Sequence, residues 1–201
     1  MAVGQRIGIE PDLGKNKPLW FILFLFLLAP IFEELVKVSP LLLIWIRRFL
    51  INGTAALWTG MGLGVGFGLG EAVYLAYKVS QNAEYSSLPW YGFSGYFGER
   101  LVVCLAHGVM TAVAVTGLQR GAVQGIMGYL AAVGLHALIN LGSLLPKLDL
   151  IPLWGSQLYL GGSMVMLVFL FERLRQRGEK DIEKIDLAEE FVFFCRGRGK
   201  G

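Results

Sequence analysis

The sequence predicts an all-α protein, a multi-pass transmembrane helical bundle with about five to six membrane-embedded helices. Its composition is the first observation behind this prediction. Of the 201 residues, 55% are hydrophobic and only 16% are charged, with a further 27 glycines, and the mean hydropathy is +0.57. Soluble domains are roughly 45 to 50% apolar even when glycine is counted. We therefore expect the excess apolar surface to face a lipid bilayer.

The second observation is that apolar runs of spanning length recur along the chain. They cover residues 19–46, 54–77, 101–118, 122–145 and 153–171. A transmembrane helix needs about 20 apolar residues. The runs therefore predict a transmembrane core over 19–171, preceded by a polar N-terminal segment over 1–18 and followed by a charged tail over 172–201.

The first run has two readings. As one helix, its 28 residues would extend about 42 Å, against a hydrocarbon core of about 30 Å. Pro30 and Pro40 are both able to interrupt it. We expect either one tilted span or a hairpin of two half-spans.

The second run contains glycines at alternate positions, which are Gly60, Gly62, Gly64, Gly66, Gly68 and Gly70. They form small-xxx-small patterns on two faces of one helix and predict close helix packing. The glycine motifs that bind nucleotide phosphates require a different spacing. We therefore expect no nucleotide site here.

The third observation is where the charges lie. The tail over 172–201 holds 8 of the 18 Lys and Arg and 7 of the 15 Asp and Glu. A cluster of Arg173, Arg175, Arg177 and Lys180 follows the last run, and basic residues mark the cytoplasmic side. We expect a multi-pass protein of the cell membrane with a cytoplasmic tail. The near balance of charge in that tail, and the lack of any Cys/His finger spacing, argue against nucleic acid as a partner.

Six ionisable residues remain inside the apolar runs. They are Glu33, Glu34, Lys37, Glu71, His107 and His136, and the two histidines are the only ones in the chain. Such groups are costly in a bilayer, so each needs a partner or a function. At 1.5 Å per residue, Glu34, Glu71, His107 and His136 all lie about 18 to 25 Å from the inner ends of their helices. We expect one polar layer formed by four spans.

The chemistry of this layer suggests a metal site. Glutamate and histidine are zinc ligands, and a catalytic zinc site has three protein ligands and an open position for water. Glu71, His107 and His136 supply three ligands. Glu33 or Glu34 is placed to take the proton of the water and return it to a leaving amine.

Two further residues are expected to support the site. Lys37 lies one helical turn after Glu33, so we expect these two to pair and leave Glu34 about 100° around the helix. Asn140 lies one turn after His136. It is placed to be a fourth ligand, a hydrogen-bond donor to an oxyanion, or a partner that orients the imidazole.

Other functions are compatible with the same residues. A single intramembrane histidine often bonds to a neighbouring helix, and a Glu and Lys one turn apart often neutralise each other. Glu71 and the histidines also suit the proton relay of a proton-coupled transporter. A catalytically silent binding or immunity-type membrane protein is the other alternative.

Four motifs in order resemble those of PrsW-like intramembrane metalloproteases, which are related to the CAAX-processing and bacteriocin-processing membrane proteases. Glu33-Glu34-Leu35-Val36-Lys37 resembles the family's E-E-x-x-K, and Phe67 to Glu71 its F-x-x-x-E. Arg100 through His107 is similar to its Arg-then-His span, and His136 to Asn140 to its H-x-x-x-D/N. The resemblance covers about residues 19–171. Ala72 stands where the family often has Asn, and Asn140 where Asp is common.

The resemblance implies an intramembrane endopeptidase that cleaves a membrane-anchored protein substrate in or near the lipid bilayer. It implies that Glu33 and Glu34 act as base or water-positioning residues. Glu71, His107 and His136 would then be the metal-site residues, with Zn²⁺ as the expected ion, and Lys37 and Asn140 supporting groups. These roles agree with those reached from the chemistry of the layer.

Overall fold

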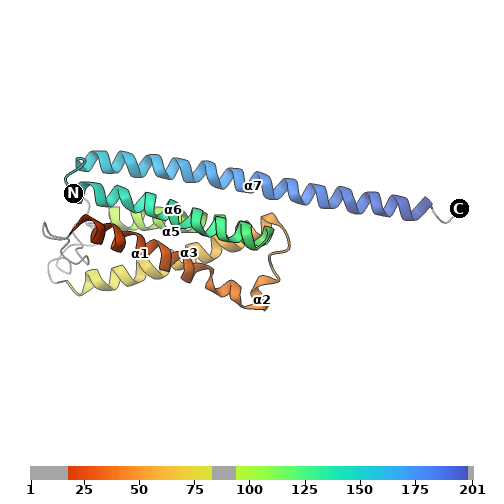
Figure 1. Cartoon of the computed structure of the whole chain (residues 1–201), viewed down its shortest axis with the longest axis horizontal. Coiled ribbons are helices and arrows are strands. Elements are labelled where there is room, and N and C mark those ends of the chain that lie inside the picture. The colour runs from red at the N-terminus through yellow and green to blue at the C-terminus, as the bar shows by residue number, and fades with distance from the viewer. Residues whose placement is uncertain (1–17, 83–93, 199–201) are drawn as a thin grey trace.

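The fold is an all-α bundle, as the sequence predicts. A computed structural model describes residues 18–82 and 94–198 of the chain. Six α-helices make it up, and no strand occurs among the described residues; the helices are α1 (Leu19–Val38), α2 (Ile44–Arg47), α3 (Gly53–Ser80), α5 (Ser94–Arg120), α6 (Ala122–Lys147) and α7 (Leu153–Arg198). The four long helices α1, α3, α5 and α6 run side by side with the first part of α7, and the rest of α7 projects beyond them (Figure 1).

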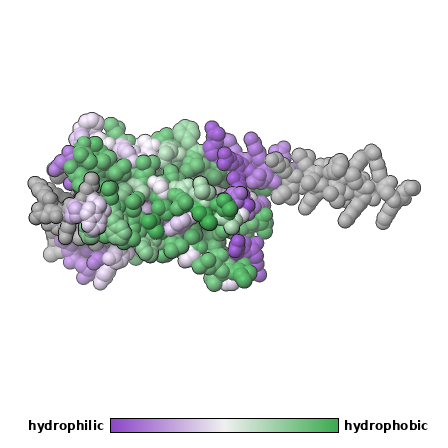
Figure 2. Space-filling model, viewed as in Figure 1, coloured by the Kyte–Doolittle hydropathy of each residue, from purple (hydrophilic) through white to green (hydrophobic). Residues whose placement is uncertain are grey.

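The surface of the bundle is suited to lipid. Three described helices, Phe97–Arg120, Ala122–Lys147 and Leu153–Glu183, are long and apolar enough to cross a membrane. Large hydrophobic side chains point outward on every long helix, for example Phe24, Trp58, Leu101, Ile126 and Phe169. Figure 2 shows these apolar side chains as a broad band between hydrophilic ends.

The first apolar run is one helix followed by a break, which is neither of the two predicted forms. Helix α1 has 20 residues with Pro30 inside it, a length of about 30 Å. Pro40 has no backbone N–H to continue the helix, and a 3-10 turn over Ser39–Leu42 follows, then the four residues of α2. The charged residues of α1 therefore lie in its last two turns.

The glycines of α3 pack on one face only. A Cβ atom on Gly60 would lie 2.5 Å from the Cα of Ala112, and one on Gly68 would lie 2.8 Å from the Cα of Cys104. Gly64, between them, faces the backbone of His107. Only glycine allows α3 and α5 to approach this closely, and the approach places Glu71 beside His107. The second glycine face, at Gly62, Gly66 and Gly70, has no atom within 4 Å of the added Cβ.

Helix α7 continues without a break through residue 172, where the composition changes from apolar to charged. Beyond that point it contacts the bundle end where α3 begins and α5 finishes. The Arg120 guanidinium lies 3.8 Å from the Asp181 carboxylate. The first 17 residues of the predicted N-terminal polar segment lie outside the described residues.

Candidate active site

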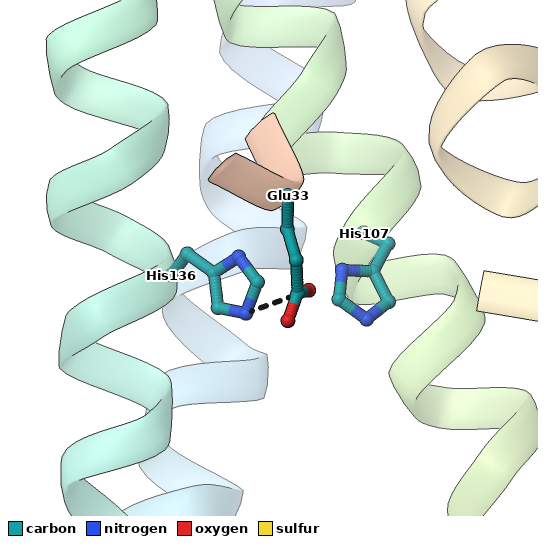
Figure 3. Close-up of side chains that lie close together, drawn as sticks. All are labelled: Glu33, His107 and His136. Carbon is teal, nitrogen blue, oxygen red and sulfur yellow. Dashed lines mark ion pairs between the residues drawn. The ribbon is translucent and has the colours of Figure 1, made fainter. Parts of the chain in front are cut away.

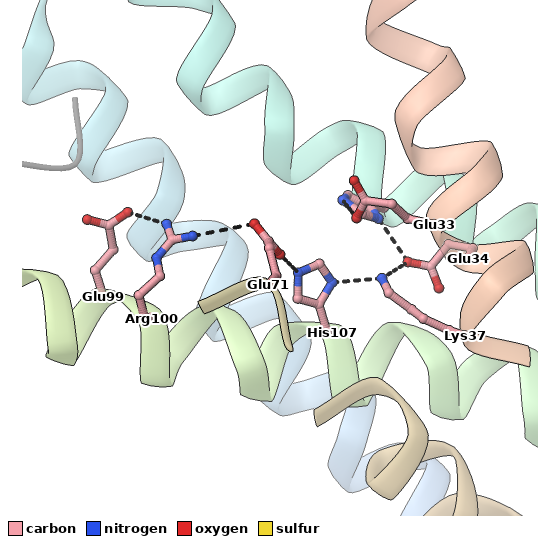
Figure 4. A network of polar contacts seen from close by, with 8 residues as sticks. Glu33, Glu34, Lys37, Glu71, Glu99, Arg100 and His107 are labelled. Atoms are coloured by element: carbon pink, nitrogen blue, oxygen red, sulfur yellow. Dashed lines mark hydrogen bonds and ion pairs between the residues drawn. The ribbon is translucent and has the colours of Figure 1, made fainter. Parts of the chain in front are cut away.

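Four helices bring the predicted polar residues together in the interior of the bundle. Helix α1 contributes Glu33, Glu34 and Lys37, and α3, α5 and α6 contribute Glu71, His107 and His136. Figure 4 shows them as one connected network. Contacts join Glu71 to His107 at 3.0 Å and Glu34 to His136 at 2.8 Å. These contacts join polar groups of four helices at one level of the bundle.

A fully buried ion pair stands at the centre of this network. The Lys37 ammonium lies 2.5 Å from Glu34 Oε1, and both side chains are 0% exposed. The predicted pair of Lys37 and Glu33 was wrong, because Lys37 pairs with Glu34. Both glutamates are within one turn of Lys37, but Glu34 is the buried one and needs a counter-charge, whereas the Glu33 side chain is 33% exposed.

The ion pair determines which ring nitrogens of the histidines carry protons. Lys37 Nζ also lies 2.7 Å from His107 Nδ1. An ammonium group only donates hydrogen bonds, so His107 Nδ1 accepts. In the neutral ring the proton is then on Nε2, which donates to Glu71 Oε2.

His136 has the opposite arrangement. Its Nδ1 lies 2.8 Å from Glu34 Oε1, and because an ionised carboxylate only accepts, Nδ1 donates. Its Nε2 therefore keeps a free lone pair, and this atom lies 3.6 Å from Glu33 Oε2. One buried pair thus holds the two histidines in opposite tautomers.

One group of side chains in the described part of the chain could hold a metal ion. Each of Glu33, His107 and His136 offers a ligand atom, and these atoms all lie within 4.8 Å of one another. Figure 3 shows the Glu33 carboxylate between the two imidazoles. Two imidazoles and a carboxylate are a donor set that zinc accepts in catalytic sites. Glu71 was predicted as the carboxylate of this set, whereas the structure places Glu71 at hydrogen-bond distance from His107 Nε2.

A cavity of about 460 Å³ adjoins the cluster. Glu33, Glu71, His107, His136 and Asn140 all line it, whereas Glu34 and Lys37 do not. Of the two glutamates expected to act on the water, Glu33 therefore lines the cavity and Glu34 does not; of the two expected supporting groups, Asn140 lines it and Lys37 does not.

The network also extends beyond the residues singled out for chemistry. The Arg100 guanidinium lies 3.5 Å from Glu71 and 2.6 Å from Glu99. The ring of Phe67 has its centroid 4.8 Å from Lys37 Nζ. The spacing of seven residues between Arg100 and His107 places both on one face of α5, so the participation of Arg100 was readable from the sequence.

Comparison with known proteins gives one match. A family model described as PrsW family intramembrane metalloprotease matches residues 3–171. No curated protein and no solved structure matches the chain.

Proposed function

The chain belongs to the PrsW family of intramembrane metalloproteases, and on this basis we propose that it is a zinc-dependent endopeptidase acting on membrane-anchored proteins. The grouping of Glu33, His107 and His136 within 4.8 Å carries the proposal. Its position supports this function, because the group lies beside a cavity of about 460 Å³ between helices whose outer surfaces are apolar.

Of the three carboxylates on the cavity wall, Glu33 is the best third ligand. It belongs to the group that lies within 4.8 Å, with His107 and His136. A zinc ion held there would supply a water of lowered pKa. Glu71, whose side chain is 32% exposed, is then the carboxylate that accepts the proton of the attacking water and returns it to the leaving amide nitrogen.

The remaining residues hold these groups in place. Lys37 donates to His107 Nδ1, so His107 would bind a metal ion through Nε2 only after its proton has moved from Nε2 to Nδ1. Glu34 accepts from His136 Nδ1, which leaves the Nε2 lone pair of that ring for the metal ion. Hydrogen bonds of this kind fix the orientation of ligating histidines. We therefore propose that Glu34 orients His136 and does not act as the base. Asn140, one turn after His136 and on the cavity wall, is placed to donate to the oxyanion.

The polar contacts favour a protease over a transporter that relays protons. From the site they extend through Glu71 and Arg100 to Glu99. In the other direction, among the described residues, they pass through Lys37 and Glu34 to His136 and Glu33, which line the same cavity. A relay requires a path to both sides of the membrane.

Metal analysis of the purified protein tests the proposed function. We expect about one zinc per chain at neutral pH in the wild type, loss of the metal in His107→Ala and His136→Ala, and cleavage of a membrane-anchored peptide only in the wild type. Cleavage by protein that contains no metal would contradict a zinc-dependent mechanism. Bound zinc without cleavage of any membrane-anchored peptide would favour the silent binding protein.

We also propose that the charged part of α7 lies in the cytoplasm of the cell. The bundle end from which it leaves holds the basic residues Arg47, Arg48 and Arg120, as expected of a cytoplasmic side. A fluorescent protein fused after residue 201 is expected to fluoresce, whereas an alkaline phosphatase fused there is expected to be inactive. The reverse pattern would invert the topology.

A further inference from the structure

The cavity beside the cluster has two chemically different walls. Its polar wall holds Glu33, Glu71, His107 and His136. The remaining lining is largely apolar and comes from α5, α6 and α7; the residues used below are Ala106, Met110, Ile139, Leu160, Gly161 and Met164. A volume of about 460 Å³ is in the range of pockets that enclose small ligands.

We propose that this apolar lining is the subsite for a large uncharged side chain, such as Leu, Met or Phe, next to the scissile peptide bond. The inference rests on the proposed function and names the substrate class of that site. A peptide bond placed at His107 and His136 would have apolar lining residues beside it, because Met110 and Ile139 each lie one turn from a histidine on the same helix. Burying that side chain against Met110 and Met164 removes apolar surface from water, and methionine adapts to different apolar shapes.

The charges around the cavity exclude acidic side chains. Three carboxylates line it, those of Glu33, Glu71 and Glu99, and Arg100 already pairs with two of them. An Asp or Glu of a substrate would meet like charges there. The subsite is therefore expected to discriminate by charge as well as by size.

The cavity is long enough for a segment of extended chain. It follows α5 from Met110 to Gly98, a distance of about 18 Å at 1.5 Å per residue. An extended peptide rises about 3.3 Å per residue, so about five residues of substrate fit along it. Gly98 and Glu99 at one end are exposed, which gives this segment a way in.

Two adjacent glycines of α7 provide a matched test. Gly161 lines the cavity, and a Cβ atom there would have no atom within 4 Å. Gly162 is equally open and exposed but is not among the lining residues. A leucine at 161 therefore fills part of the subsite, while a leucine at 162 adds the same bulk to the same helix outside it.

The first experiment compares cleavage of transmembrane peptides that carry Leu, Phe, Ala or Asp beside the scissile bond. We expect kcat/KM to be at least about tenfold higher for Leu than for Ala or Asp, the discrimination typical of one apolar pocket. Gly161→Leu should lower kcat/KM for the Leu peptide about tenfold and leave the Ala peptide within about threefold. Met164→Ala, which enlarges the pocket, should shift preference from Leu toward Phe.

The second experiment measures occupancy without turnover. A peptide with a diazirine analogue of leucine at the same position is irradiated with the protein, and the labelled residues are mapped by mass spectrometry. We expect labels on Met110, Ile139 or Met164 in the wild type and in Gly162→Leu, and their loss in Gly161→Leu.

Three outcomes would contradict the proposed subsite. They are equal labelling in all three proteins, labelling confined to other surfaces, and a preference for Asp over Leu. Because labelling needs no cleavage, a protein that labels as expected but does not cleave contradicts the proposed function alone.

Discussion

The ammonium of Lys37 lies 2.7 Å from Nδ1 of His107, on a helix 70 residues further along the chain. The same ammonium lies 2.5 Å from Glu34, which in turn bonds to His136. One buried lysine thus connects both histidines of the protein. Its predicted effects concern tautomers, metal affinity and stability.

Replacing Lys37 with Met removes the donor that keeps His107 Nδ1 unprotonated. In metal-free protein labelled with ¹⁵N-histidine, only two rings contribute signals. We expect the wild type to show one ring protonated on Nε2 and one on Nδ1, and the variant to lose the Nε2 form of His107. Zinc affinity should rise, because a metal ion binds the Nε2 lone pair of a ring protonated on Nδ1, and Lys37 stabilises the other tautomer of His107. Lys78→Met, at the exposed end of α3, is the control, and equal spectra in all three proteins would exclude this role for Lys37.

The pair of Glu34 and Lys37 should behave as a unit in stability. Removing one partner of a buried ion pair typically costs about 3 to 5 kcal/mol, because the other charge is left without compensation. We expect Lys37→Met alone to destabilise by about this amount, and the double variant Glu34→Gln, Lys37→Met to regain most of it. Unfolding in mild detergent measures all members of this double-mutant cycle. Additive losses in the double variant would mean that the two side chains do not interact.

Much of this arrangement is predictable from the sequence. Apolar runs define the helices, and charged or histidine residues inside them are rare enough that Glu34, Glu71, His107 and His136 stand out as one layer. The sequence does not decide which glutamate pairs with Lys37, since Glu33 and Glu34 are both one turn away and only burial separates them.

The sequence also does not decide whether Glu33 or Glu71 is the metal ligand. The choice depends on how α1 and α3 are rotated against α5, and helical spacing within one helix carries no such information. The apolar wall of the cavity was not predicted either, because Met110 and Met164 do not differ in sequence from other core residues.

Replacing glycine with alanine should lower the stability of the protein on one glycine face of α3 and maintain or raise it on the other. In Gly64→Ala the new methyl group meets the backbone of His107, and overpacking of this kind costs about 1 to 3 kcal/mol. In Gly66→Ala the methyl group has no atom within 4 Å, and alanine is the better helix former by about 1 kcal/mol. We expect the midpoint of thermal unfolding in detergent to fall for the first and to hold or rise for the second. Equal shifts would mean that α3 does not contact α5 through Gly64.

Two substitutions, Glu33→Gln and Glu71→Gln, test which glutamate binds the metal ion and which accepts the proton of the water. Both side chains line the cavity and are about one-third exposed, at 33% and 32%, so burial does not distinguish them. Glu33 is grouped with His107 and His136, and an amide is a much weaker zinc ligand than a carboxylate. We expect Glu33→Gln to lose both metal and cleavage, while Glu71→Gln keeps the metal and loses at least about 10²-fold in kcat, the usual contribution of a general base. Elemental analysis beside single-turnover cleavage checks both. The opposite pattern, with metal lost only in Glu71→Gln, would make Glu71 the ligand. Glu33 would then be the base, because it is the other carboxylate beside the two histidines.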